Sequence, residues 1–450
     1  MFDTVINNGL IIDPANRIQS KLHLGISRGK VACLSAEPLA GGRVIDAAGL
    51  VVAPGFVDLH MHEDPLDQAS GQFDVKIFAT MLRMGVTTAI GGNCGIGPRD
   101  PAAYLAAADR SGLPVNIGLY AAHSELRKPY AADNYRPAPA DAPAQMAADL
   151  DRQLAAGCVG ISFGLRYVPG TTAEELQALA AVAARHKKLV AAHARDDAAY
   201  VLAAFNELIG LAAAHGARVQ ISHIGSMAAF GQMDAVLAMV DAACAAGLDI
   251  GLDCYPYNAF CTHIGSATYD PGFLERYGIG YDAIEITGGK YRGQRCTAAT
   301  FAEVRAASPE VLAVAHVMRD REIDLALAHP RVVMASDGIL VGGSGHPRAA
   351  GSFPRLISQY VKTKKLLTLH DAVAKATVRP AERVGLAKGS LAKGSDADLV
   401  IFAYDRLRDN ADFASPLAPP DGIEWVLLGG ETAVRQGEIV NDRLGKAVRV

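Results

Sequence analysis

The sequence predicts an α/β protein whose middle part is a (β/α)8 barrel and whose two ends are rich in β structure. In the middle of the 450-residue chain, short apolar runs alternate eight times with longer segments, several of them rich in Ala and Leu. This alternation is typical of parallel strands separated by helices. At both ends, short apolar runs alternate instead with turn-forming Asn, Asp, Pro and Gly. A doubly wound open sheet is the alternative arrangement for the middle part.

Both chain ends are expected to form short strands separated by turns. Residues 7–9 (Asn-Asn-Gly) and 13–16 (Asp-Pro-Ala-Asn) are turn signals in the first fifty residues. The last fifty residues likewise contain short apolar runs separated by turn-forming residues. The expected β segments are Val5–Ile6, Leu10–Ile12, Leu22–Ile26, Val31–Leu34, Ala397–Phe402, Trp425–Gly430 and Ala433–Arg435.

The middle part is expected to supply eight barrel strands and the helices between them. Pro143 suits the first turn of one of the helices, where its missing N–H costs nothing. The expected helices include Ala144–Ala156, Ala173–His186, Asp197–Ala214 and Met233–Ala246. The expected strands are Val57–His62, Thr87–Gly91, Val115–Leu119, Val159–Phe163, Leu189–His193, Val219–His223, Ile250–Asp253 and Val332–Asp337.

Composition and charge argue against several classes of protein. The formal net charge is −4 without a basic block, so a nucleic-acid partner has little support. The N-terminus lacks the basic start and apolar core of a signal peptide, and no apolar segment is expected to reach the length of a membrane span. Seven scattered cysteines without a Cys-x-x-Cys pair fit reduced thiols. We therefore expect a cytoplasmic protein that acts on a small molecule.

Side chains that can bind a metal gather where the expected strands end. The run Pro54–His62 closes with two histidines at i, i+2, which on a strand point to the same side. Active sites of (β/α)8 barrels lie at the carboxyl ends of the strands, so residues from separate strands meet there. A divalent metal such as zinc is favoured over scattered structural histidines. The candidate ligands are His60 and His62 (first strand), Cys94 (just after the second), His193 (fifth), His223 (sixth) and Asp337 (eighth).

Cys94 and Asp337 each have a plainer interpretation. Cysteine is often just a small buried hydrophobic residue. Cys94, however, follows an apolar run in a turn where Gly91, Gly92 and Gly95 permit tight geometry, which favours a metal-bound thiolate. Asp337 can cap the next segment. Beside the histidines we prefer a role for it as metal ligand, proton acceptor or both.

These residues resemble the amidohydrolase superfamily over essentially the whole chain, and several stretches are similar to its N-acyl-D-amino-acid deacylases (D-aminoacylases). The resemblance implies a metal-dependent, TIM-like (β/α)8 hydrolase barrel over residues 54–385. It also implies a small β-sandwich domain formed by residues 1–53 and 386–450. The stretches similar to the deacylases are Gly91–Gly95, Gly164–Gly170, Asp253–Tyr257, Ser336–Gly338 and His346–Arg348 followed by Gly351–Arg355.

The resemblance further implies how the metal ligands divide. A tightly held zinc is implied on Cys94, His193 and His223, and a second, weaker position on His60, His62 and Asp337. One metal or two is left open.

A missing lysine supports the role of the cysteine. Related hydantoinases and dihydroorotases usually bridge their metals with a carboxylated lysine at the end of the fourth strand. This chain has no lysine between Lys128 and Lys187, and the expected fourth strand lies inside that gap. Cys94 can supply the anionic ligand instead.

The chain departs from the deacylases at one position. They place a lysine two residues after the histidine of the sixth strand, where it helps to hold the substrate carboxylate, whereas this chain has Gly225. Arg348, Tyr255 or Tyr257 can contribute to substrate binding, since Arg binds carboxylates in a bidentate manner. A structural ion pair for Arg348 and a wall-packing role for the tyrosines are equally open.

The expected reaction is hydrolysis of a linear amide, most simply an N-acyl-D-amino acid, by a zinc-activated water. Asp337 would take the proton of that water and pass it to the leaving nitrogen. D-specificity follows from the resemblance alone. One alternative is a cyclic amidohydrolase that opens a hydantoin or dihydropyrimidine ring, and another is a non-catalytic binding protein on the same scaffold. The acyl group, the substrate side chain and the oligomeric state stay open.

Overall fold

The computed structural model describes residues 1–67 and 69–450, and its central feature is a barrel of eight parallel strands. Each barrel strand pairs with the barrel strands before and after it, so the order contains no reversal. A doubly wound sheet reverses its strand order, and that alternative is therefore wrong. The barrel strands are β6 (Phe56–Asp58), β7 (Val86–Gly91), β8 (Asn116–Ala122), β9 (Gly160–Gly164), β10 (Leu189–His193), β11 (Arg218–Ile221), β12 (Ile250–Cys254) and β16 (Val332–Met334).

The barrel closes where its first and last strands end. Met61 forms a parallel bridge with Gly338. The backbone N–H of Asp337 donates to the carbonyl of His60 at 2.8 Å, and that of His62 donates to the carbonyl of Gly338 at 2.8 Å. The residues that close the barrel are thus the candidate ligands and their neighbours.

All eight predicted strands are confirmed, but the first, sixth and last end earlier than expected, the sixth at Ile221 instead of His223. The first strand ends at Asp58 and does not reach His62. It ends there because the Asp58 carboxylate accepts hydrogen bonds from backbone N–H groups that would otherwise continue the sheet. Its Oδ1 accepts from the N–H of His60 at 3.2 Å and from that of Ser336 at 3.1 Å. The last ends at Met334. The histidines of the first motif therefore lie in the closing segment just after the strand.

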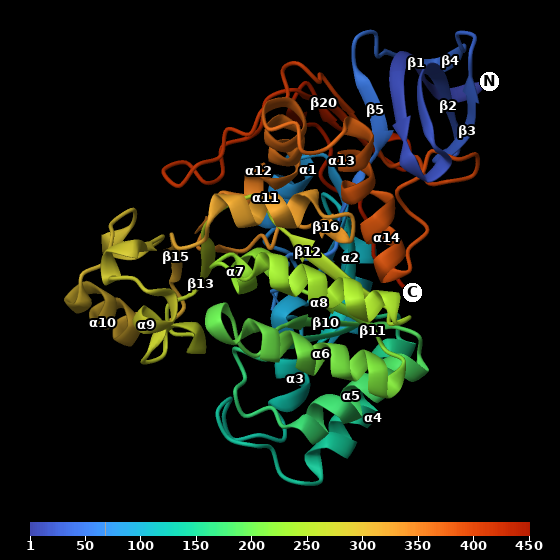
Figure 1. The fold of residues 1–450 in the computed structure, drawn as a ribbon. Coiled ribbons are helices and arrows are strands. Elements are labelled where there is room, and N and C mark those ends of the chain that lie inside the picture. The colour runs from blue at the N-terminus through green and yellow to red at the C-terminus, as the bar shows by residue number, and fades with distance from the viewer. Residues whose placement is uncertain (68) are drawn as a thin grey trace.

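The four predicted helices are confirmed and lie side by side on the outside of the barrel (Figure 1). Thr172 caps one of them by accepting from the N–H of Glu175 at 3.2 Å. The four are α4 (Ala142–Ala155), α5 (Ala173–Arg185), α6 (Val201–His215, after a 3-10 turn at Ala198–Tyr200) and α8 (Met233–Ala245). The remaining helices of this part are α1 (Lys76–Arg83), α2 (Pro101–Ser111), α3 (His123–Arg127), α7 (Ile224–Ala228), α11 (Asp320–Ala328), α12 (Arg348–Arg355), α13 (Leu369–Ala376) and α14 (Val378–Val384).

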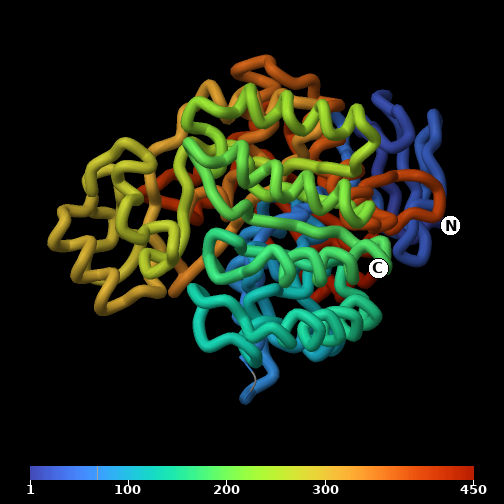
Figure 2. The backbone as a smooth tube through the Cα atoms, turned by 60° about the horizontal axis from the view of Figure 1, so that its bottom comes forward, coloured from blue at the N-terminus to red at the C-terminus, as the bar shows by residue number. Residues whose placement is uncertain are grey.

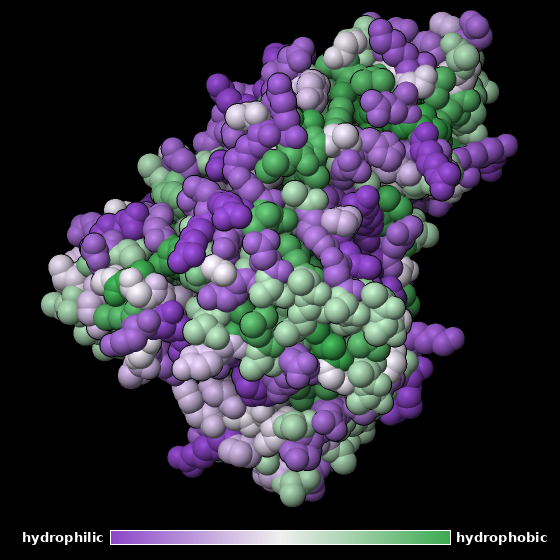
Figure 3. Space-filling model, in the orientation of Figure 1, coloured by the Kyte–Doolittle hydropathy of each residue, from purple (hydrophilic) through white to green (hydrophobic). Residues whose placement is uncertain are grey.

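One helical segment contradicts the expectation that no apolar segment reaches the length of a membrane span. The helical segment Ala198–His215 is long and apolar enough, by length and composition, to cross a membrane. It is rich in alanine and leucine, and Val201, Phe205 and Leu208 on one of its sides are buried. Hydrophobic residues also gather over α6 and α8 in the view of Figure 3. In this fold the segment is part of the barrel wall, where it packs on β11 and on α8.

Strands from both chain ends share one nine-stranded sheet. The blue and red segments lie side by side at one end of the molecule in Figure 2. Leu24, Leu399 and Leu427 belong to a hydrophobic cluster that is separate from the core of the barrel. Because this cluster contains residues from both chain ends, it confirms that the two ends build one β unit. The domain boundaries at 53/54 and 385/386 stay a prediction. The strands are β1 (Phe2–Asp13), β2 (Ile18–Ser27), β3 (Lys30–Ser35), β4 (Gly41–Asp46), β5 (Val51–Pro54), β19 (Leu399–Phe402), β20 (Ile423–Leu428), β21 (Glu431–Arg435) and β22 (Glu438–Ile439).

An insertion between β12 and α11 was not predicted. It forms the yellow and orange lobe beside the barrel in Figures 1 and 2, and its core is a three-stranded antiparallel sheet. The lobe supplies one wall of the cavity described below. It contains β13 (Phe260–His263), α9 (Phe273–Tyr277), β14 (Ile284–Ile286), α10 (Ala298–Ala307) and β15 (Leu312–Ala315), and a short hairpin of β17 (Leu340–Val341) and β18 (Ser344–Gly345) follows β16.

Candidate active site

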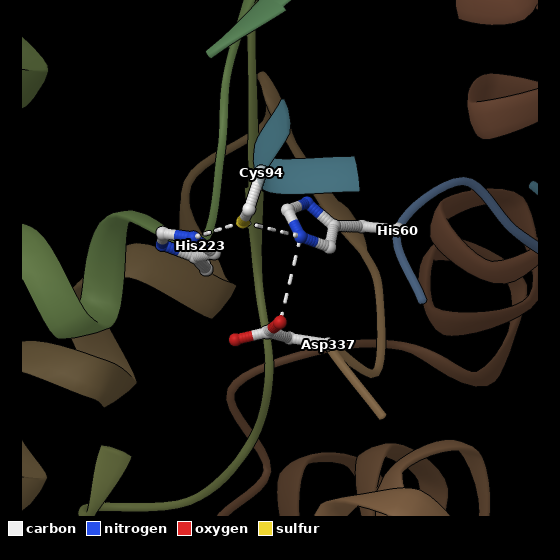
Figure 4. Close-up of side chains that lie close together, drawn as sticks. All are labelled: His60, Cys94, His223 and Asp337. Carbon is white, nitrogen blue, oxygen red and sulfur yellow. Dashed lines mark hydrogen bonds and ion pairs between the residues drawn. The ribbon is translucent and has the colours of Figure 1, made fainter. Parts of the chain in front are cut away.

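The thiol of Cys94 lies among three imidazoles that come from the ends of three other strands. Its Sγ is 3.4 Å from Nε2 of His60, 3.3 Å from Nε2 of His223 and 3.9 Å from Nδ1 of His193. All four side chains are buried. Figure 4 shows Cys94 between His60 and His223, with the three side chains pointing toward one another.

Asp337 adjoins this group on the other side of His60. Its Oδ1 is 3.4 Å from Nε2 of His60 and 3.3 Å from Nε2 of His62. Its Oδ2 forms an ion pair with Nη1 of Arg348 at 2.9 Å. The ligand atoms of His60, Cys94, His223 and Asp337 all lie within 4.8 Å of one another. The six predicted ligand residues therefore form one continuous cluster.

The distances within the cluster fit a divalent metal. With zinc–sulfur bonds of about 2.3 Å and zinc–nitrogen bonds of about 2.05 Å, two tetrahedral ligands lie about 3.6 Å apart. The sulfur–nitrogen distances around Cys94 are 3.3, 3.4 and 3.9 Å. A nitrogen and an oxygen ligand lie about 3.4 Å apart on the same geometry, as His60 and His62 do from Asp337. Soft thiolate with imidazole is also a donor set that suits zinc.

Three of the candidate ligands have a backbone conformation that L-residues rarely adopt. The φ angles are +52° at Cys94, +34° at His223 and +50° at Asp337. Such strain persists only where the surrounding structure enforces it, and it is concentrated at functional sites. Near Cys94 the enforcing contact comes from Asn93, whose side-chain amide donates to the carbonyl of Met61 at 3.2 Å. The turn of Cys94 is thereby tied to the histidine segment.

The turn of Cys94 also occupies the end of the fourth barrel strand. A Cβ at Gly164, the last residue of β9, would lie 2.0 Å from the backbone oxygen of Cys94. That separation is far below any van der Waals contact, so this position admits no side chain. A carboxylated lysine is excluded at this position by the space that the cysteine turn fills.

We expect Gly164→Ala to displace the Cys94 turn and weaken metal binding by at least about tenfold. Losses of this size in metal affinity are typical when the groups that orient a metal ligand are changed. Overpacking should also destabilise the fold by about 1–3 kcal/mol. Metal affinity and thermal unfolding measure the two effects. Gly210→Ala is the matched control, because a Cβ at Gly210 meets nothing within 4 Å. Equal metal affinity in the two variants would contradict this packing argument.

Neighbouring side chains orient the imidazoles. The Ser226 hydroxyl lies 2.9 Å from Nδ1 of His223, which leaves Nε2 facing the thiol. The Asp253 carboxylate accepts from the backbone N–H of His223 at 2.7 Å and lies 3.6 Å from Nδ1 of His60. Gln220 donates to the other oxygen of Asp253 at 2.8 Å. Partners of this kind fix ring orientation and raise ligand basicity at metal sites.

The electrostatics favour the protonation states that metal ligands need at Cys94, Asp337 and His193. Burial opposes ionisation of the Cys94 thiol, but the charges of His60 and His223 hold its pKa well below its ordinary value. Burial likewise opposes ionisation of Asp337, and the Arg348 guanidinium outweighs it and holds the pKa of that carboxyl well below its usual range. Burial lowers the pKa of His193 to about 4. Thiolate, carboxylate and neutral imidazole are the forms that bind a metal. Burial opposes the charged form of His60 and His62, but the neighbouring Cys94 and Asp337 raise the pKa of His60 and raise that of His62 to about 9, so these two imidazoles lose a proton when a metal binds.

A cavity adjoins the cluster, and Arg348 reaches it from α12. The helix is anchored where Phe353 stacks on Phe56 of β6, with ring centroids 5.5 Å apart. The guanidinium donates to the carbonyl of Cys261 at 3.0 Å and lies over the ring of Tyr255 at 4.7 Å. The cavity is lined by Tyr167, His193, Asp197, His223, Ser226, Met227, Phe260, Cys261, Thr262, Thr268, Tyr277, Asp337 and Arg348.

The two tyrosines predicted to bind substrate are not among the lining residues. The Tyr255 ring packs under Arg348, and its hydroxyl faces the sulfur of Met318 at 3.9 Å. The Tyr257 hydroxyl donates to Asp409 at 2.8 Å. Tyr255 therefore supports Arg348, and Tyr257 is engaged outside the cavity.

Packing also explains the glycine at position 225. A Cβ at Gly225 would lie 2.8 Å from Cδ1 of Ile323 and 3.1 Å from both Sγ of Cys254 and Cε of Met318. The space in which a longer side chain would start is filled by other residues of this chain.

Sequence reasoning missed several residues of the site. Asp253 ends the seventh predicted strand, and that position was a signal that could have found it. Ser226 follows a predicted ligand by three residues and carried no such signal. Thr268 and Tyr277 belong to the unpredicted insertion, and Asp197 lies in the loop after β10.

A (β/α)8 barrel with buried thiolate, imidazole and carboxylate groups at its strand ends defines a metal-dependent hydrolase. A model of the amidohydrolase family matches residues 76–434. The chain is 34% identical to the N-acyl-D-glutamate deacylase of Alcaligenes xylosoxydans xylosoxydans, covering 95% of this chain and 93% of that protein. It is 29% identical to the D-aminoacylase of the same organism, covering 99% of this chain and 97% of that protein.

Comparison with a solved structure also shows similarity to a deacylase of this kind. The chain superposes on the N-acyl-D-glutamate deacylase of Bordetella bronchiseptica, complexed with zinc and a phosphonate mimic of the tetrahedral intermediate, with a TM-score of 0.88. The identity is 30%, and each chain is covered completely. The protein belongs to the amidohydrolase family, and the predicted resemblance to its N-acyl-D-amino-acid deacylases is confirmed.

Proposed function

We propose that this amidohydrolase removes the acyl group from N-acyl-D-amino acids with zinc as its metal. The observation that carries the proposal is the cluster around Cys94, whose sulfur–nitrogen distances of 3.3, 3.4 and 3.9 Å suit a tetrahedral metal. The relatives that share the fold over their full length are named as deacylases of this class. The substrate is a small molecule, and a cytoplasmic location is part of the proposal.

Each residue of the cluster has a role in this proposal. Cys94, His193 and His223 would hold the tight metal, and His60 and His62 would hold a second position with Asp337. A divalent metal bound there would supply polarisation of the amide carbonyl and a lowered pKa of water. Asp337 accepts a proton from the attacking water and delivers it to the leaving nitrogen as the C–N bond breaks. The products are a carboxylate and a free amine.

Arg348 is the residue we assign to the α-carboxylate of the substrate. Among the residues that line the cavity it is the one with a permanent positive charge. Its Nη1 pairs with Asp337, while its Nε is buried without a partner among the described residues. A buried guanidinium with a free donor can take a carboxylate. Tyr255 would act through Arg348, by stacking beneath it.

A cyclic amidohydrolase is the second candidate, and the glycine at position 225 is the observation that favours it. The end of the fourth strand argues against it. Gly164 stands there, and the backbone of Cys94 fills the side-chain space. A non-catalytic binding protein is disfavoured, because the six ligand residues and their supporting groups Ser226 and Asp253 form one ordered arrangement.

The test is turnover of the zinc-loaded protein on paired N-acetyl-D- and N-acetyl-L-amino acids, with hydantoin and dihydroorotate alongside. Release of free amine from D substrates only is the expected result. Ring opening without deacylation would transfer the assignment to the cyclic amidohydrolases. Absence of all four activities in a zinc-loaded, folded sample would favour the binding protein.

A further inference from the structure

The imidazole of His60 is buried with one of its two nitrogens unpaired. Its Nε2 faces Cys94 and Asp337, the side on which a metal would bind. Its Nδ1 has no hydrogen-bond partner among the described residues, although the residue is fully buried. When Nε2 binds a metal, Nδ1 carries the hydrogen of the ring and needs an acceptor. The acidic atom beside Nδ1 is Oδ1 of Asp253, at 3.6 Å.

The Asp253 oxygen lies next to a ligand of each proposed metal position. At 3.6 Å it is close to Nδ1 of His60 but not hydrogen-bonded to it, and a relative shift of about 0.6 Å would complete the bond. The same oxygen accepts from the backbone N–H of His223 at 2.7 Å. One carboxylate oxygen therefore adjoins His223 of the tight position and His60 of the weaker one.

Asp253 is itself held by a chain of polar groups inside the barrel. Its Oδ2 accepts from the side-chain amide of Gln220 at 2.8 Å. Oε1 of Gln220 in turn accepts from Nε of Arg383 at 3.2 Å. Gly251 leaves room for this contact, because a Cβ there would lie 2.4 Å from Oε1 of Gln220 and 2.6 Å from Nε of Arg383. The place of the carboxylate is therefore fixed independently of His60.

The hydrogen bonds of Asp253 do not by themselves account for its charge. The backbone N–H of His223 and the amide of Gln220 are neutral donors. Among the described residues no Lys or Arg forms an ion pair with Asp253, and Arg383 reaches only Gln220 of this pair. Burying a carboxylate without a paired cation costs free energy. An imidazole that binds a metal through one nitrogen gains basicity from a carboxylate at the other, which gives the charge a use.

We infer that Asp253 is a positioning residue of the metal centre. It fixes the His60 ring through Nδ1 and the His223 backbone through the same oxygen, and it acts only through these two ligands. The inference rests on the metal ligands of the proposed function and adds the group that sets their affinity for the metal.

The experiment titrates the metal-free protein with cobalt(II), which reports on its ligands by absorption, in competition with a chelator. Cobalt bound to the Cys94 thiolate gives a charge-transfer band, and cobalt bound to imidazole and carboxylate alone gives only weaker ligand-field bands. We expect Asp253→Asn to weaken cobalt binding by about 10–100-fold, the usual cost of losing a carboxylate partner of a ligand histidine. The ligand-field bands should shift as well, because the His60 ring is no longer fixed.

The double variant Asp253→Asn with Gln220→Glu is the matched control for packing. A carboxylate at position 220 can accept from the new amide at 253 and from Arg383, so the buried chain and its net charge are kept. His60 then faces a neutral group. We expect the double variant to unfold near the wild-type temperature without metal and still to bind cobalt about 10–100-fold more weakly.

The outcomes separate this inference from the proposed function. Wild-type cobalt affinity in Asp253→Asn, or its recovery in the double variant, would overturn the inference and leave the metal ligands and the deacylase function standing. A wild-type protein that binds cobalt without a charge-transfer band would overturn the assignment of Cys94 and the inference with it.

Discussion

Asp337→Asn is expected to lower kcat by about a thousandfold or more while most of the zinc stays bound. Proton transfer by a positioned side chain contributes about 10²–10⁴-fold, and an amide cannot accept the proton of the attacking water. Cys94, His193 and His223, which we assign to the tight metal, keep their mutual contacts. Steady-state kinetics and metal analysis of the same sample measure both effects.

The Asp337→Asn experiment needs a control, because Asp337 also neutralises the buried guanidinium of Arg348. Removing one member of a buried ion pair costs about 3–5 kcal/mol. Asp398→Asn removes a buried carboxylate that pairs with Lys388 at 2.6 Å in the β unit, away from the cluster. It should lower the free energy of unfolding and keep kcat. Near-normal turnover in Asp337→Asn would refute the acid/base role.

The second large effect is expected for Cys94→Ala, which should lose the tightly bound metal and with it all activity. Cys94 Sγ lies close to three imidazole nitrogens, so its removal leaves the tight site without its anionic ligand. Metal content after dialysis against a weak chelator measures the change.

Cys158→Ala is the matched control for the cysteine. Cys158 is also buried, but burial raises the pKa of its thiol to about 12, so it stays protonated. This variant should retain metal and activity. Full zinc retention in Cys94→Ala would show that the thiolate is not a ligand.

The barrel and its ligand cluster were predictable because each depends on local patterns. Apolar runs of strand length recur eight times, and the residues that follow them are chemically unusual. The sequence alone therefore places His60, Cys94 and His223 at or just beyond strand ends. What joins them in space is the barrel itself, which brings the carboxyl ends of all its strands to one face.

The remaining features depend on packing between distant segments, which no local pattern encodes. The sequence did not indicate that Asp58 would end the first strand by binding the backbone of Ser336. Spacing alone also could not show that the Tyr257 hydroxyl faces Asp409. The cavity wall near Asp197 required the insertion, whose three short antiparallel strands lack the regular strand–helix alternation.

We propose that deacylation requires zinc bound at the Cys94 cluster. The most direct test is the return of activity as zinc is added to metal-free protein. Amine release from the best N-acyl-D-amino acid found is measured at each zinc addition. We expect no turnover without metal and a rise in turnover in proportion to zinc over the first equivalent, and we expect no such rise in Cys94→Ala. Full turnover by the metal-free protein, or equal recovery in Cys94→Ala, would contradict it.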